Sequence, residues 1–275
     1  MLSLRTPSPA PPPIRFYTLP KTTFGGVTKK VMKEMLDTLG PNEVAIVFAR
    51  GYQVAKIDKT LLCRQSPFFH AAFTGNFREA EDRCIRLKHD YPGAIKAMMH
   101  FLVTGYYGLD ADLVRQNGFL TMLDLHIHAY VVADKYRIPD LAEYAINEYR
   151  KAVADILAQD FGSDMAGANA KPERSLVESP HFADWRPSAE VDRFLNSVVL
   201  LWKNTPDGID EMRYTVLELI KPCLAKLARV RMFGALLAEL EEFGMDLERS
   251  LYEDGLEVVV CGMGAKGRHL VGFGV

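Results

Sequence analysis

"DKTLLCRQSPFF" (residues 58–69) places two helix starts and an aromatic pair within twelve residues. Ser66 followed by Pro67 is a strong start signal, because a serine hydroxyl can accept an unpaired amide proton of the first turn and proline is pre-set for the first helical position. Asp58 can cap a shorter helix in the same way. Phe68 and Phe69 then begin an apolar helical stripe that needs a partner surface. The stretch offers no catalytic group, so it predicts packing and binding.

The bulk composition is that of a globular chain with a sizeable core. Of the 275 residues, 48% are hydrophobic, and the formal net charge of −2 gives no basic excess for nucleic acid. We interpret the basic residues between Lys21 and Lys33 as a solvated face. No apolar run approaches the roughly 20 residues that a membrane helix needs, and no signal peptide is recognisable at the N-terminus. We therefore expect neither membrane nor nucleic-acid binding.

The cysteines favour a reducing compartment. Cys63, Cys84, Cys223 and Cys261 are widely spaced and contain no CxxC pair. This spacing predicts neither a zinc site nor a disulfide framework. We therefore expect free thiols and an intracellular protein, in the cytoplasm or the nucleus.

The N-terminal half has the pattern of an α+β domain. Residues 1–40 form a proline-rich, flexible leader with one short helix near its end. Two strands follow as a β-hairpin across a two-residue turn at Arg50-Gly51. The two short helices of the opening stretch come next, then a strand at residues 84–87. Helices are predicted from Pro92, from about Phe119 and from Pro139, the last reaching about Ala154.

The C-terminal half is expected to be a separate all-α module. Residues 154–187 are rich in glycine, proline and serine, and predict a linker. Ser188 begins a strongly amphipathic helix, and further apolar stripes continue through residues 188–253. Around Pro222 the pattern allows either one kinked helix or two separate ones. Residues 254–275 form a glycine-rich tail, either loose or holding one weak strand.

The order of these elements resembles the BTB/POZ domain over about residues 41–153, and its motifs occur in the family's order. The stretches that carry the resemblance are 43–47 (EVAIV), 59–63 (KTLLC), 66–69 (SPFF), 77–80 (FREA), 85–87 (IRL), 101–106 (FLVTGY) and 133–136 (ADKY). The helical second half is similar to the extension of many fungal BTB chains. The family often has a histidine before the helix-opening lysine, whereas this chain has Asp58, which keeps the capping chemistry.

The resemblance implies a protein–protein adaptor. BTB domains commonly dimerise, and many bind a cullin-type ubiquitin-ligase scaffold through an apolar-x-Glu triplet in the loop before the short strand. Phe77 and Glu79 stand at that place. A partly exposed phenylalanine can fill a partner's pocket while a nearby carboxylate orients the complex. The other interpretation is that Phe77 closes the domain's own core and Glu79 is solvated. The cargo protein is unknown.

Dimerisation offers a second set of candidate residues. Leu61, Leu62, Phe68 and Phe69 could contribute to a homodimer surface, although core packing is the more common role for each residue type.

Other functional classes find little support in the sequence. His126 and His128 are two residues apart, which points their rings to different faces of a helix, so we expect no metal site. No cofactor motif and no catalytic constellation is recognisable. The alternative to a cullin adaptor is a homotypic scaffold or a transcription-associated oligomer, and the less favoured alternative is an enzyme with an unfamiliar site in the helical half.

Overall fold

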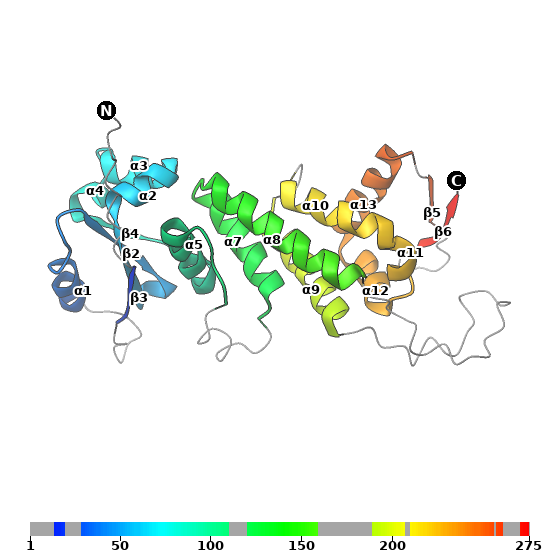
Figure 1. The fold of residues 1–275 in the computed structure, drawn as a ribbon, viewed down its shortest axis with the longest axis horizontal. Coiled ribbons are helices and arrows are strands. Elements are labelled where there is room, and N and C mark those ends of the chain that lie inside the picture. The colour runs from blue at the N-terminus through cyan, green and yellow to red at the C-terminus, as the bar shows by residue number, and fades with distance from the viewer. Residues whose placement is uncertain are drawn as a thin grey trace, which may run out of the picture. The chain divides into compact units, whose positions relative to one another are not determined.

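The computed structural model describes residues 14–19, 29–109, 120–158, 189–206, 210–255, 257–260 and 270–274. The chain divides into two compact units, Met1–Ala145 and Ile146–Val275, with the boundary inside one helix. Figure 1 labels the elements of both units.

A four-stranded sheet forms the centre of the first unit. β2 (Glu43–Phe48) and β3 (Gln53–Asp58) form the predicted antiparallel hairpin, and β4 (Cys84–Arg86) lies parallel to β2. β1 (Arg15–Thr18) pairs antiparallel with the outer side of β3, which gives the order β1-β3-β2-β4. The predicted α+β architecture is confirmed, with one strand more than expected.

The hairpin turn differs from the prediction. Phe48 pairs with Gln53, so four residues rather than two connect the strands. Ala49, Arg50 and Gly51 all have positive φ angles, of 52°, 58° and 92°. This left-handed run ends the extended backbone one residue earlier than the apolar pattern of β2 indicates.

β1 corrects part of the prediction that residues 1–40 form a flexible leader with one short helix. The Phe16 ring packs edge-on against Phe48, with 6.5 Å between ring centroids. Leu19 is buried, and its N–H donates to the carbonyl of Tyr52 at 2.7 Å. A strand of four residues carries too little alternation to be predicted locally, and its partner strand is distant in the sequence. Residues 1–13 of the leader lie outside the described part.

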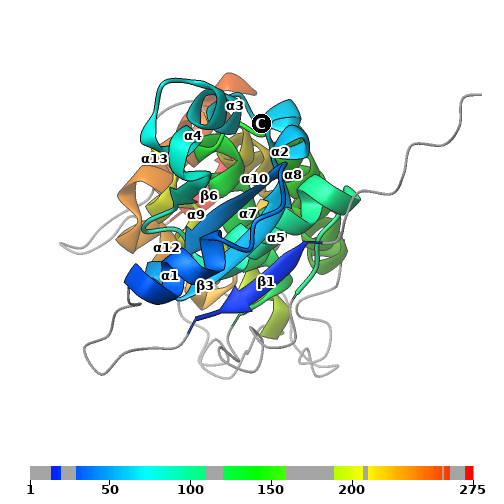
Figure 2. The same cartoon turned by 90° about the vertical axis from the view of Figure 1, so that its left-hand side faces the viewer.

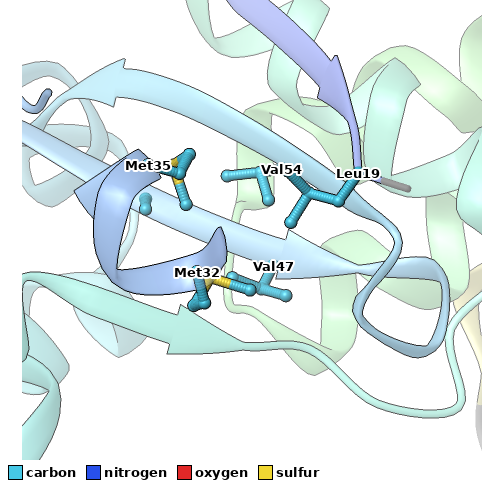
Figure 3. Packing of buried hydrophobic residues seen from close by; sticks show 6 residues of the cluster. Leu19, Met32, Met35, Val47 and Val54 are labelled. Carbon is cyan, nitrogen blue, oxygen red and sulfur yellow. The ribbon is translucent and has the colours of Figure 1, made fainter. Parts of the chain in front are cut away.

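A small apolar cluster joins α1 (Lys29–Leu36) to one face of the sheet. Met32 and Met35 pack against Val47 and Val54 of the central strands and against Leu19. Figure 3 shows these side chains converging between the helix and the strands. Figure 2 shows α1 beside β3 and the edge strand β1.

Helices complete the first unit, and several begin at the predicted residues. Asp58 caps α2 by accepting the Leu61 N–H at 2.9 Å, and Ser66 caps α3. α5 ends at Gly105, whose φ of 79° is readily accessible to glycine. The helices are α2 (Lys59–Gln65), α3 (Pro67–Thr74), α4 (Arg78–Asp82), α5 (Pro92–Thr104), α7 (Met122–Lys135) and α8 (Pro139–Ala158), of which α8 continues into the second unit from Ile146.

α8 extends five residues into the segment predicted as a linker. Val153 and Leu157 are both buried, so the apolar stripe of the helix continues to its last turn. The remainder of the predicted linker, residues 159–187, and the predicted cap Ser188 lie outside the described residues.

The second unit is mostly helical, as predicted. Pro222 lies in a 3-10 turn (Lys221–Cys223) between α10 (Glu211–Ile220) and α11 (Leu224–Leu227), so the second of the two predicted alternatives, two separate helices, is the one observed. The last apolar stripe is likewise divided at Leu240. The helices are α9 (Ala189–Asn204), α10 (Glu211–Ile220), α11 (Leu224–Leu227), α12 (Arg231–Glu239) and α13 (Glu241–Glu253).

The C-terminal tail holds more structure than predicted. β5 (Glu257–Val260) and β6 (Leu270–Gly274) form a two-stranded antiparallel ladder, whereas the sequence indicated a loose tail or one strand. Valines dominate β5, but glycines surround both strands and weaken the local signal.

A buried arginine connects three helices of the second unit. Arg213 of α10 is 3% exposed. Its Nε donates to Thr205 Oγ1 at 2.7 Å, and its Nη2 donates to the carbonyls of Trp202 and Thr205 at 3.1 and 2.8 Å. Asp246 of α13 accepts from Arg213 Nη1 at 3.4 Å and from Trp202 Nε1 at 3.0 Å. The positive charge is therefore both paired and hydrogen-bonded, as a buried charge requires.

Candidate partner-binding site

The loop between α3 and α4 presents an exposed aromatic side chain. Phe77 is 57% exposed. Gly75 ends α3, with its N–H donating to the Ala71 carbonyl at 3.0 Å. A Cβ atom at position 75 would lie 2.9 Å from two carbons of the Phe77 ring. The absence of a side chain at Gly75 therefore lets the Phe77 ring lie across the end of α3.

α4 anchors this loop to the sheet. Arg83 at its C-cap adopts the left-handed conformation, and its Nη1 donates to the Gly40 carbonyl at 2.9 Å. The Arg83 carbonyl accepts the Ala45 N–H of β2, also at 2.9 Å. Glu79 lies in the first turn of α4, where a carboxylate is favoured by the helix dipole. Phe77 at the end of the loop and Glu79 in the first turn of α4 are thus held on a fixed base.

The alternative role of Phe77 as a core residue does not fit its exposure. More than half of the Phe77 side chain is open to solvent, and Glu79, two residues further along the chain, is half-buried. An exposed phenylalanine near a carboxylate can enter a partner's pocket and orient the complex by charge.

The four candidate dimer residues separate into two pairs. Leu62 and Phe69 are fully buried, so they belong to the core and are not available to a partner. Leu61 and Phe68 are half-buried and still present part of their side chains at the surface. Their alternation follows from helix geometry, because adjacent residues on a helix point in directions about 100° apart.

The opening stretch of the sequence packs against the end of α7. The buried Ser66 hydroxyl donates to the Tyr136 carbonyl at 2.6 Å and accepts the Phe69 N–H at 3.1 Å. The Tyr136 ring stacks on Phe69 and meets Phe68 edge-on, at centroid distances of 5.4 and 5.1 Å. Two motifs about 70 residues apart in sequence therefore form one contact.

Comparison with protein families agrees with this arrangement. The family model described as "BTB/POZ domain" matches residues 41–148. Residues 41–148 are a BTB/POZ domain. The comparison with curated proteins found no match for the chain. BTB domains are protein-interaction modules rather than typical catalysts, which gives this chain a role in protein binding.

Asp90 is a structural residue of the BTB domain that sequence reasoning missed. Its carboxylate accepts from Lys135 Nζ and from the Tyr136 hydroxyl, each at 2.6 Å. Burial raises the pKa of Tyr136 above its ordinary value, and the hydrogen bond to the Asp90 carboxylate raises it further. No local sequence pattern indicates the role of Asp90, because its partners are about 45 residues away.

The two histidines of α7 have separate partners. His126 is buried, with its Nδ1 2.8 Å from the Tyr107 hydroxyl. His128 stacks on Tyr91 with 4.6 Å between centroids, and burial lowers its pKa. Within the described residues, no cluster of three or more His, Cys, Asp or Glu side chains is arranged to hold a metal ion.

Among the described residues, no helix combines the length and the apolar character needed to cross a bilayer.

Proposed function

We propose that this chain is an adaptor that self-associates through its BTB domain and recruits a partner to a cullin-type ubiquitin-ligase scaffold. The scaffold binds the α3–α4 loop, with Phe77 entering an apolar pocket and Glu79 orienting the complex. The helical second unit holds a cargo protein. Covalent chemistry belongs to the recruited enzyme, and the adaptor contributes by positioning.

The exposure of Phe77 is the observation that carries the cullin proposal. Burying a large apolar side chain on complex formation removes it from water, and aromatic residues are frequent binding hot spots. The ring lies over Gly75 and the loop is fastened to the sheet by Arg83, so little conformational freedom is lost on binding.

Leu61 and Phe68 are the candidates that remain for the self-association surface. Both retain exposed area, and Phe68 lies on a rigid aromatic base formed by Phe69 and Tyr136. The test is sedimentation equilibrium of the whole chain at tens of micromolar. A chain that remains monomeric at these concentrations contradicts self-association.

The cullin proposal is tested by titration calorimetry of the whole chain with the N-terminal domain of a cullin scaffold. Phe77→Ala is expected to weaken binding by about 2 kcal/mol, or roughly thirtyfold. Tyr106→Ala is the matched control, because Tyr106 has the same 57% exposure in the same unit. Equal affinity for the wild type and the Phe77 variant would refute the assignment. If the wild type does not bind the scaffold, the homotypic scaffold is the better description.

A further inference from the structure

The outward face of α13 carries two large exposed side chains. Met245 is 47% exposed and Tyr252 is 78% exposed. They are seven residues apart, which is close to two helical turns, so both lie on one side of the helix. The opposite side carries Phe243, Leu247 and Leu251, which are buried in the unit's own core. α13 therefore has one packed face and, on its other side, two large side chains that the described residues leave exposed.

Two exposed charges of opposite sign lie between these side chains. Glu248 and Arg249 are adjacent in the sequence and both point to solvent. At about 100° per residue, they fall on either side of the line from Met245 to Tyr252. Along the helix, the outward face therefore presents an apolar, an acidic, a basic and an aromatic side chain in this order.

This order is complementary to itself when a second copy runs antiparallel. A two-fold axis placed between Glu248 and Arg249 sets each Glu248 opposite Arg249 of the other copy. The same axis sets each Met245 opposite Tyr252 of the other copy, because Met245 precedes Glu248 by three residues and Tyr252 follows Arg249 by three residues. Two-fold interfaces of this kind use the same patch on both molecules.

A parallel arrangement lacks this complementarity. It would set Arg249 against Arg249 and Glu248 against Glu248, and like charges at close range are unfavourable. A thioether beside a tyrosine ring, as in the antiparallel arrangement, is a favourable contact. The charge pattern therefore favours a second copy of the same helix as the partner, and favours its antiparallel orientation.

We propose that the outward face of α13, formed by Met245, Glu248, Arg249 and Tyr252, binds the same face of a second copy of this chain in antiparallel orientation. Glu248 also takes part in an interaction within its own chain, and a carboxylate has acceptor capacity for a second. The contact is small, so alone it gives a weak, concentration-dependent dimer. It lies outside residues 41–148 and is separate from self-association by the BTB domain. Together the two contacts would link dimers into larger assemblies.

The proposal is tested by sedimentation velocity on the whole chain over a range of concentrations at low ionic strength, where exposed charges are least screened. Arg249→Glu turns two attractive pairs into two repulsive ones, and we expect the dissociation constant of this contact to rise about tenfold or more. Glu248→Arg should have the same effect. Arg231→Glu is the control, because it makes the same change at an exposed position of α12.

Mixing separates this contact from a loss of folding. An equimolar mixture of the Glu248→Arg and Arg249→Glu chains restores opposite charges across the axis, and so does the double variant E248R/R249E. We expect both to regain the association of the wild type.

The proposal is overturned if Arg249→Glu sediments as the wild type does at every concentration. It is equally overturned if the mixture associates no better than each variant alone. If Arg249→Glu loses the larger assemblies of the wild type but keeps a dimer, that dimer belongs to the BTB domain, since no variant alters residues 41–148.

Discussion

Replacing Ser66 by alanine removes one oxygen atom from the contact between α3 and the end of α7. The Ser66 side chain is completely buried. Its hydroxyl satisfies two backbone groups at once, since it accepts the Phe69 N–H at 3.1 Å and donates to the Tyr136 carbonyl at 2.6 Å. The alanine variant therefore leaves both groups without this partner.

The cost follows from these two bonds. Loss of a serine N-cap destabilises a protein by about 1 kcal/mol, and a buried carbonyl left without a partner costs about 1–3 kcal/mol. We therefore expect Ser66→Ala to lower the free energy of unfolding of the first unit by roughly 2–4 kcal/mol. The control is Thr74→Ala, which removes an exposed hydroxyl from the other end of α3 and should cost less than about 0.5 kcal/mol.

The assay must distinguish the two halves of the chain. Both tryptophans, Trp185 and Trp202, lie after residue 146, so tryptophan fluorescence follows only the second half. Native-state hydrogen exchange, read on peptides from α3 and the end of α7, reports the first unit directly. Faster exchange is expected there, with no change in fluorescence-detected unfolding. If Ser66→Ala exchanges no faster than Thr74→Ala, the reasoning about this contact is refuted.

Two further predictions concern buried polar groups. The pKa of Tyr136 in the folded chain is raised above the ordinary tyrosine value of about 10. The unfolded chain therefore loses the phenol proton at a lower pH than the folded chain does. The stability that Tyr136 contributes is complete below about pH 10 and is lost as the pH rises further. Tyr136→Phe should therefore give a flatter loss of stability above pH 10 in urea titrations, while Asp90 keeps its ion pair with Lys135. Arg213→Met should lower the unfolding free energy of the second unit by about 3–5 kcal/mol, because Asp246 loses a buried partner.

Each of these has a simple check. Equal alkaline slopes for the wild type and Tyr136→Phe would contradict the role assigned to the phenol. For the second unit, Trp202 fluorescence follows unfolding in urea, and Arg231→Met makes the same change at an exposed position. Equal unfolding midpoints for the Arg213 and Arg231 variants would contradict the importance of the buried network.

The elements that local chemistry dictates were predictable from the sequence. Asp58 and Ser66 cap the helices that they were expected to cap, and Gly105 ends α5 in the left-handed conformation. These features depend on a few adjacent residues, whose side chains and backbone preferences act within one turn. The resemblance to the BTB domain rested on such local motifs, and the family match over residues 41–148 confirms it.

The features that were missed depend on partners distant in the sequence. β1 is stabilised by pairing with β3, and Asp90 by its bonds to Lys135 and Tyr136. The four-residue hairpin turn follows from the register of the whole ladder rather than from Arg50 and Gly51 alone. No local pattern contains this information.

The exposed apolar residues were the most difficult to interpret from the sequence, and they carry both proposals. In an amphipathic stretch a phenylalanine, methionine or tyrosine is usually assigned to the core, which is correct for Phe69 and Phe243 but not for Phe77, Met245 or Tyr252. What separates the two groups is their position relative to the rest of the fold. Phe77 stays exposed because α4 fastens its loop to the sheet. Tyr252 stays exposed because the opposite face of α13 packs against the core of the second unit. The folded core therefore determines which apolar side chains remain for partners.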